Sequence, residues 1–181
     1  GSWLYLVSAR DAAGNLSDAG SVTVTVAATL VQVVRASADT WVNSSAPTKN
    51  YGSSNALTTR GTAATVSYLK FAMPAAPVGR TLATVVLSFR TTTSSGAGAT
   101  TPQYVRITSD AWTERTVTWN AKPSYTGTLV GTLGAAPAVS TTYRVGLVAS
   151  TLLAARSAAG NVNVALVSSG SDLMTFASSE N

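Results

Sequence analysis

The stretch DAWTERTVTWNAKPSYTG, residues 110–127, stands out from a chain that is otherwise rich in Ala, Thr, Ser and Val. It holds two of the four tryptophans and two of the seven acidic residues. In TVTWN (116–120), Val117 and Trp119 alternate with threonines, which predicts a strand with one apolar face. A tryptophan that shares a face with valine usually lies in a core, because its ring covers a large apolar area. We therefore interpret this stretch as part of a β-scaffold.

The two acids of the stretch, Asp110 and Glu114, raise the alternative of a glycosidase pair. Such a pair needs two carboxylates about 5–10 Å apart, on either side of the scissile bond. The sequence shows few other acids and no aromatic cleft around this pair. Histidine and cysteine are absent, which excludes a catalytic His or Cys, the usual triads, disulfides and zinc–thiolate sites. We expect a protein that is not an enzyme and that requires no cofactor.

Composition indicates a globular β-protein. Hydrophobic residues make up 45% of the chain and charged residues 10%, and the abundant Val and Thr favour strands. The net charge is +5, from 12 basic and 7 acidic residues. The basic residues are scattered along the chain, so we expect no nucleic-acid partner. The charge suits either a soluble surface or an acidic polysaccharide. No apolar run reaches eighteen residues, which argues against membrane insertion.

Alternating segments separated by turn-forming loops predict an antiparallel β-sandwich. A long polar loop covers 44–56, and one short helix is expected within 149–160. In the segment 66–73, Leu69 points into the core, whereas Tyr68 and Lys70 point outward. The further strand-like segments are 29–37, 39–43, 81–91, 103–109, 141–148, 161–169 and 172–178.

The first residues form a separate pattern. Two strand-like segments, 3–9 and 22–26, flank a turn-rich stretch, and two strands alone do not make a stable domain. The sequence YLVSARDAAGNLSDAGSVTVTV (5–26) resembles the last two strands of a fibronectin type III or immunoglobulin-like repeat, a common linker in secreted bacterial proteins. We therefore divide the chain into a hairpin, 1–28, and a sandwich, 29–181, and expect the chain to be an interior piece of a longer protein.

Residues 29–181 resemble the DNRLRE-type module, also classed as carbohydrate-binding module family 96. Three segments carry the resemblance besides the central motif: ADTWVNSSAPTKNYGSSNALTTRG (38–61), SYLKFAM (67–73) and LMTFASSEN (173–181). The motif W-x-E-x-x-x-T-W-N with a following proline is matched by Trp112, Glu114, Thr118, Trp119, Asn120 and Pro123.

The resemblance implies a non-catalytic, jelly-roll-like sandwich that binds carbohydrate or mediates adhesion as part of a secreted or cell-surface bacterial protein. In alginate-binding members, basic residues contact the anionic sugar; the matching positions here are Lys49 and Arg60. Trp41 and Tyr51 are candidates to stack on a sugar ring. Asn43 stands where members often carry a basic residue, which reduces the basic capacity of this site. Solvated surface charges remain the alternative for the two cations.

A structural calcium ion is a further candidate, because calcium takes six to eight oxygen ligands. The candidate donors are Asp39, Asn50, Asn55 and Glu180. Asp39 also suits a turn-capping role.

The resemblance also suggests an assembly. Family members usually continue past the closing phrase into one more strand, and here the phrase reads Ser178-Ser179-Glu180 in place of Ser-Arg-Glu. A sandwich without its last strand has an open sheet edge with unpaired backbone groups. Strand addition through Val22, Val24 and Val26 of the hairpin, or of a neighbour's copy of it, would fill that edge. The alternative function is therefore a structural subunit of an extracellular filament that self-associates by donor-strand exchange. The alternative to strand addition is that the sequence is simply cut at these two points, before the hairpin and after the closing phrase.

Overall fold

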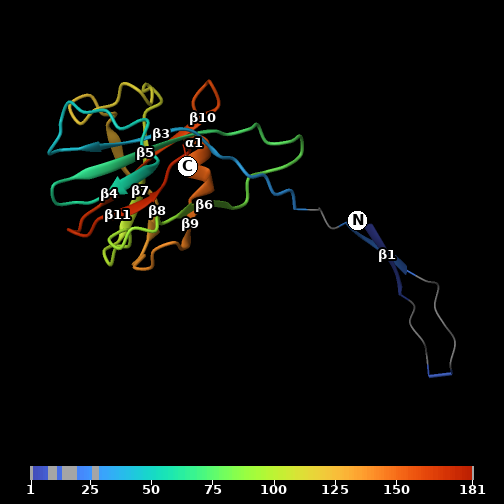
Figure 1. Ribbon diagram of the computed structural model, residues 1–181. Helices are drawn as coiled ribbons and strands as arrows, with labels where there is room; N and C mark the ends of the chain where they lie inside the picture. Colours follow the sequence, from blue (N-terminus) through green and yellow to red (C-terminus); the bar gives the residue numbers. More distant parts are fainter. Residues whose placement is uncertain (1, 8–11, 14–19, 26–28, 181) are drawn as a thin grey trace. The chain divides into compact units, whose positions relative to one another are not determined.

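The computed structural model describes residues 2–7, 12–13, 20–25 and 29–180 (Figure 1). The chain falls into two compact units, Gly1–Val33 and Val34–Asn181, and each is described by itself. The one helix in the described part is far too short to cross a membrane.

The first unit contains an antiparallel hairpin of β1 (Ser2–Val7) and β2 (Gly20–Thr25). The register runs from Ser2 opposite Thr25 to Val7 opposite Gly20, so the predicted hairpin is confirmed. Of the residues assigned to strand exchange, Val22 and Val24 belong to β2, where their backbones pair with β1. Val26 lies outside the described residues. Strand exchange stays a prediction.

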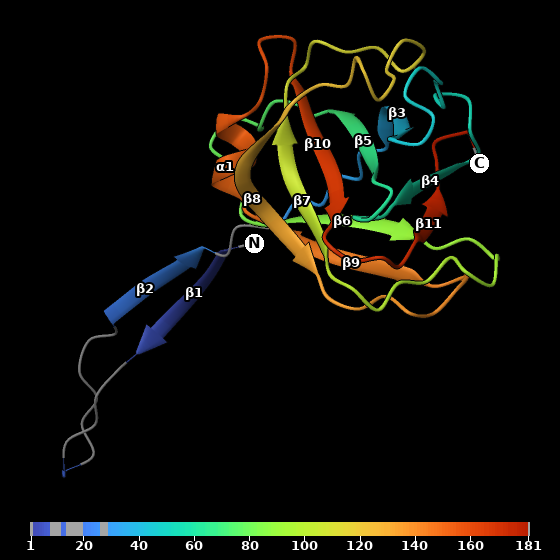
Figure 2. The same cartoon turned by 90° about the vertical axis from the view of Figure 1, so that its left-hand side faces the viewer.

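The second unit is an antiparallel β-sandwich, as the sequence predicts. A five-stranded sheet has the order β3-β5-β10-β7-β8, and two smaller sheets pair β11 with β4 and β6 with β9. The smaller sheets lie against one face of the five-stranded sheet (Figure 2). The elements are β3 (Ala36–Asn43), β4 (Ala56–Thr59), β5 (Thr65–Ala72), β6 (Val85–Arg90), β7 (Gln103–Thr108), β8 (Tyr125–Leu133), β9 (Thr142–Leu147), α1 (Ala149–Ala154), β10 (Asn161–Ser168) and β11 (Met174–Ala177).

The first core fills the space between the layers. Strand β6 contributes Leu87 and Phe89 to it, whereas Val86, on the opposite face of the strand, is 51% exposed, so the alternation predicted for this strand is confirmed. The Phe89 ring lies 5.0 Å from that of Phe176 in β11. This aromatic contact joins the two smaller sheets and buries apolar area that stabilises the sandwich.

The opposite face of the five-stranded sheet carries a second core, which the sequence did not predict. The segment 109–124, here called the motif loop, crosses this face and buries Trp112 and Val117 against Val42, Val66 and Tyr68. Residues 116–120 are therefore not a strand, although Val117 is buried as expected. Tyr68 is fully buried and its hydroxyl donates to the Pro123 carbonyl at 3.1 Å. Tyr68 and Lys70 lie on the face opposite Leu69, as the alternation predicts, but they are not open to solvent, because the motif loop covers both.

Candidate functional site

Lys70 of β5 anchors the motif loop to the sheet. Its ammonium lies 3.0 Å from Asp110 Oδ1 and donates to the Trp112 carbonyl at 2.9 Å, with the Trp112 ring 4.8 Å away. Asn161 and Asn163 of β10 donate their side-chain amides to the same Asp110 carboxylate. Asp110 is thus a structural hub with partners on two strands. Glu114 has different partners, the backbone N–H of Asp39 and the side chain of Arg115.

The hydrogen bonds around Asp110 determine its titration. Burial raises the pKa of Asp110, but hydrogen bonds from Ser157, Lys70, Asn161 and Asn163 outweigh burial and lower the pKa from 3.8 to about 2. A carboxyl whose folded pKa is depressed contributes stability above its unfolded pKa, and that contribution is lost as the pH falls toward the folded pKa.

We therefore expect Asp110→Asn to destabilise the protein at pH 6 and to differ progressively less from the wild type as the pH falls from 4 to 2. The physical reason is that protonation removes the same charge from wild-type Asp110 that the substitution removes permanently. Thermal unfolding of both proteins, followed by circular dichroism across this range, measures the gap. A gap that stays constant from pH 6 to pH 2.5 would contradict the assignment.

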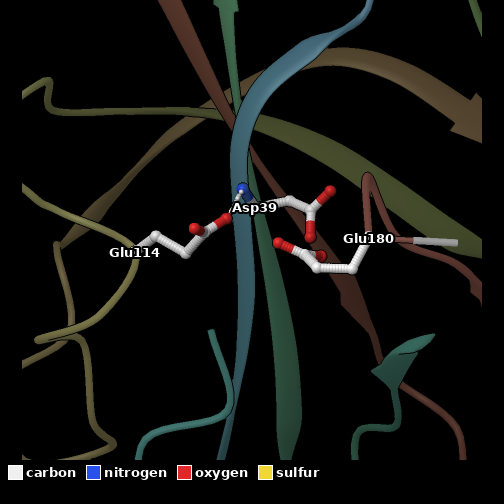
Figure 3. Close-up of side chains that lie close together, drawn as sticks. All are labelled: Asp39, Glu114 and Glu180. Atoms are coloured by element: carbon white, nitrogen blue, oxygen red, sulfur yellow. Dashed lines mark hydrogen bonds between the residues drawn. The ribbon is translucent and has the colours of Figure 1, made fainter. Parts of the chain in front are cut away.

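Three carboxylates from distant parts of the chain meet at the edge strand β3. One oxygen each from Asp39 in β3, Glu114 in the motif loop and Glu180 after β11 lies within 4.8 Å of the others (Figure 3). We call this group the carboxylate cluster. Glu114 Oε1 accepts the backbone N–H of Asp39 at 2.8 Å, and Asp39 Oδ2 accepts the N–H of Ser179 at 2.7 Å. These bonds position the carboxylates but leave their charges close together.

The electrostatics of the cluster are unfavourable for Asp39. Its side chain is buried, with 2% of the residue exposed. Burial raises the pKa of Asp39 from 3.8 to about 6; hydrogen bonds from Ser179 oppose the rise, and the charges of Glu180 and Glu114 add to it. Asp39 therefore bears an electrostatic cost when it is ionised at neutral pH.

The polar loop 44–55 holds Glu114 in place. Asn50 Nδ2 donates to the carbonyls of Glu114 at 2.9 Å and Val117 at 2.7 Å, while Asn50 Oδ1 accepts the Gly52 N–H. A Cβ on Gly52 would lie 2.1 Å from the Glu114 carbonyl oxygen, so the close approach requires glycine. Asn50 thus fixes the backbone that carries Glu114, and its own side-chain oxygen already accepts a hydrogen bond from Gly52.

Of the four predicted calcium donors, the structure brings Asp39 and Glu180 together. Asn55 directly precedes β4 in the sequence, and its backbone carbonyl accepts the Ser178 N–H at 3.3 Å. Glu114 belongs to the cluster and was missed as a donor. Its place in the W-x-E motif was the available signal, because Asp39 and Glu180 lie in two of the three other segments that carry the family resemblance.

The predicted sugar-stacking residues, Trp41 and Tyr51, form an aromatic stack. The rings of Trp41 and Tyr51 are 3.8 Å apart with an interplanar angle of 25°, and Lys49 Nζ lies 4.9 Å from the Tyr51 centroid. Trp41 also packs against the first core. Each ring therefore has one face covered by the other, and the Lys49 ammonium lies over the Tyr51 ring.

The remaining two predicted sugar contacts are engaged in local turns. Asn43 Oδ1 accepts the Ser45 N–H at 2.8 Å. Arg60 lies at the turn between β4 and β5, where its guanidinium donates to the Ala63 carbonyl at 3.4 Å. Lys49, Trp41 and Tyr51 are thus brought together, whereas the polar side chains of Asn43 and Arg60 serve the backbone next to them.

A second cation–aromatic pair lies at the end of the motif loop. Lys122 Nζ is 3.8 Å from the Trp119 ring centroid and donates to the Trp119 carbonyl at 3.0 Å. Lys122 also lines an open hollow of about 270 Å³ together with Pro123, Ser124 and Tyr125. We call this the lysine hollow. It offers a positive charge, a hydroxyl and the 40% exposed ring of Tyr125, and sequence reasoning did not select it.

The comparison with protein families agrees with this arrangement of motifs. The model of carbohydrate-binding module family 96 matches residues 31–181. No curated protein matches the chain at significant similarity. Because the family match spans the whole sandwich and most of the sequence, the chain belongs to carbohydrate-binding module family 96.

Proposed function

We propose that this chain is a non-catalytic module that binds a carboxylate-bearing polysaccharide at the lysine hollow. The observation that carries the proposal is Lys122, whose ammonium sits on the Trp119 ring at the wall of an open hollow in a carbohydrate-binding family member. An ammonium on an aromatic face provides a fixed positive charge for a sugar carboxylate. The exposed Tyr125 ring provides an apolar surface for a sugar ring.

The aromatic stack is the less favourable of the two surfaces for an anionic sugar. Tyr51 is capped by Lys49, so a sugar ring must displace that ammonium before it can stack.

Variants of the two surfaces distinguish them. We expect Lys122→Gln to weaken binding by roughly tenfold or more, because a hydrogen bond to a charged group contributes about 1.5–3 kcal/mol. Affinity electrophoresis against uronate-containing and neutral polysaccharides measures the effect, with Lys49→Gln as a matched control of the same charge change. The affinity should also fall with added salt, since an exposed ionic contact is screened.

The variants that lose binding identify which of the two surfaces holds the polysaccharide. Loss of binding in Lys122→Gln and Tyr125→Ala, with little change in Lys49→Gln and Tyr51→Ala, supports the lysine hollow. The reverse pattern overturns the hollow in favour of the stack. Failure of the wild type to bind any polysaccharide in the panel overturns the proposed function.

We place this activity outside the cell, within a larger secreted or surface protein that the module attaches to a polysaccharide. The support is the hairpin of the first unit, whose sequence resembles repeats that link modules in secreted bacterial proteins. The filament subunit stays the alternative prediction.

A further inference from the structure

We propose that Asp39, Glu114 and Glu180 form a binding site for a divalent cation, calcium by the chemistry of its donors, which fastens the motif loop and the C-terminal segment to β3. The cation site shares no residue with the aromatic stack or the lysine hollow, and it does not depend on the proposed carbohydrate binding.

The first argument is the uncompensated burial of Asp39. Asp39 is 2% exposed, and its Oδ1 is a buried atom without a hydrogen-bond partner among the described residues. A buried carboxylate oxygen costs free energy unless it is hydrogen-bonded, paired with a cation or bound to a metal. Since Oδ2 already accepts the Ser179 N–H, Oδ1 is the oxygen that lacks a ligand.

The second argument is the balance of charge. Three carboxylates share the cluster, and the one ion pair found for them in the described part of the chain is between Glu114 Oε2 and Arg115 Nε at 3.9 Å. The Arg115 side chain is 67% exposed, and exposed ion pairs of this kind contribute little. A divalent cation compensates two of the three negative charges at the point where they converge.

The third argument is geometric. Calcium binds oxygen at about 2.3–2.6 Å, so two ligands on opposite sides of one ion lie about 5 Å apart. The three carboxylate oxygens are within 4.8 Å of one another, which places them within reach of a common ion. An all-oxygen, carboxylate-rich set favours calcium over the transition metals, which prefer nitrogen or sulfur ligands. Water and backbone carbonyls commonly complete the six to eight ligands.

The site would connect segments that are far apart in the sequence. Asp39 lies in an edge strand, Glu114 in the motif loop and Glu180 beyond β11 (Figure 3). The hydrogen bonds that already join them span 75 residues from Asp39 to Glu114 and 140 residues from Asp39 to Ser179. An ion at this junction stabilises the folded state because the unfolded chain does not present the three carboxylates together.

The test is the response of the unfolding temperature to calcium. The full chain is stripped with a chelator and unfolded thermally with and without added calcium. A single site filled at about 100 times its Kd is expected to raise the Tm by roughly 5–10 °C. Terbium, titrated with excitation of the protein's tryptophans, should show saturable luminescence with one ion per chain, and calcium should displace it.

Three variants locate the ion. Asp39→Asn and Glu180→Gln should each remove most of the Tm response and weaken terbium binding at least tenfold. Glu180 is exposed, so its variant keeps the test valid even where Asp39→Asn folds poorly. Asp172→Asn is the matched control, because it removes a carboxylate that accepts hydrogen bonds from Thr100 in another loop. It should keep the full response to calcium.

Two results would overturn the proposal. One is a wild-type Tm that does not change between chelator and millimolar calcium, together with no saturable terbium signal. The other is a calcium response that survives in both Asp39→Asn and Glu180→Gln, which would place the ion elsewhere in the chain. Carbohydrate binding is measured separately on the same proteins, so failure of the cation site leaves the proposed function standing.

Discussion

Replacing Trp112 with alanine is expected to lower the free energy of unfolding by about 3–5 kcal/mol, the usual cost of truncating a buried aromatic side chain. Trp112 is 6% exposed and fills the second core, with its ring 6.2 Å from that of Tyr68. Its removal leaves a cavity between the motif loop and the sheet, and it takes the aromatic face away from the Lys70 ammonium. Chemical denaturation followed by far-UV circular dichroism measures the loss.

Trp119 provides the comparison, because it belongs to the same motif but is only half-buried. Trp119→Ala should cost less than half as much as Trp112→Ala, since less apolar area leaves the protein interior. Equal losses of unfolding free energy in the two variants, or a loss below about 1 kcal/mol in Trp112→Ala, would contradict the assignment of Trp112 as a main buried side chain of the second core.

Replacing Lys70 with methionine is expected to cost about 3 kcal/mol, because the methionine keeps the apolar stem but removes the charge from a partly buried ion pair. The variant leaves the Asp110 carboxylate without its cation and the carbonyls of Asp110 and Trp112 without a donor. The Lys70 side chain is 16% exposed and that of Asp110 28%, so solvent replaces only part of the lost contacts.

The control for Lys70→Met is Lys122→Met, which removes an ammonium from the face of a tryptophan at a more open position. Lys122→Met should cost less than about 1 kcal/mol, as expected for a cation–π contact at the surface. Urea denaturation of both variants at neutral pH measures the difference. A smaller loss in Lys70→Met than in Lys122→Met would mean that the ion pair with Asp110 does not hold the motif loop.

The sequence predicted most of the sandwich because its core strands alternate. Strand β6 places Leu87 and Phe89 inward at every second position, and this period survives in the fold. Strand β8 was not predicted, since glycines at 127 and 131 interrupt the pattern. The side chains of Val145 and Leu147 lie where a Cβ on Gly131 would be, so this glycine serves close packing between strands.

The same two-residue period led to the wrong prediction of a strand at residues 116–120. Val117 and Trp119 are two positions apart, as in a strand, but they pack on a sheet from an irregular loop. Alternation records which side chains are buried, and it does not record whether the backbone pairs with a neighbour. The alternation placed Tyr68 on the correct face of β5, but its burial was not predicted, because no residue of β5 indicates that a loop covers this face.

The candidate sites show the limit of local patterns more clearly. Lys49 and Tyr51 are neighbours in sequence, and their contact followed from the loop that holds both. The carboxylate cluster needs three segments to meet, and the sequence offered only two of its members in a longer set of candidates. Family resemblance placed Glu114 in a scaffold motif, while the structure shows that the motif also delivers a carboxylate to β3.

The position of β10 in the middle of the five-stranded sheet governs the order in which the chain can fold. Strands β5 and β7 do not pair with each other; each pairs with β10, which comes late in the sequence. The sheet is therefore complete only when residues 161–168 have joined it. The chain must lose the entropy of bringing these distant strands together before it gains most of the stabilising contacts. Such a topology has a high contact order and belongs with the β-sandwiches that fold in milliseconds to seconds. During synthesis, the pairs β3–β5 and β7–β8 can form first, but the edges of β5 and β7 that face β10 stay without a partner until residues 161–168 are made.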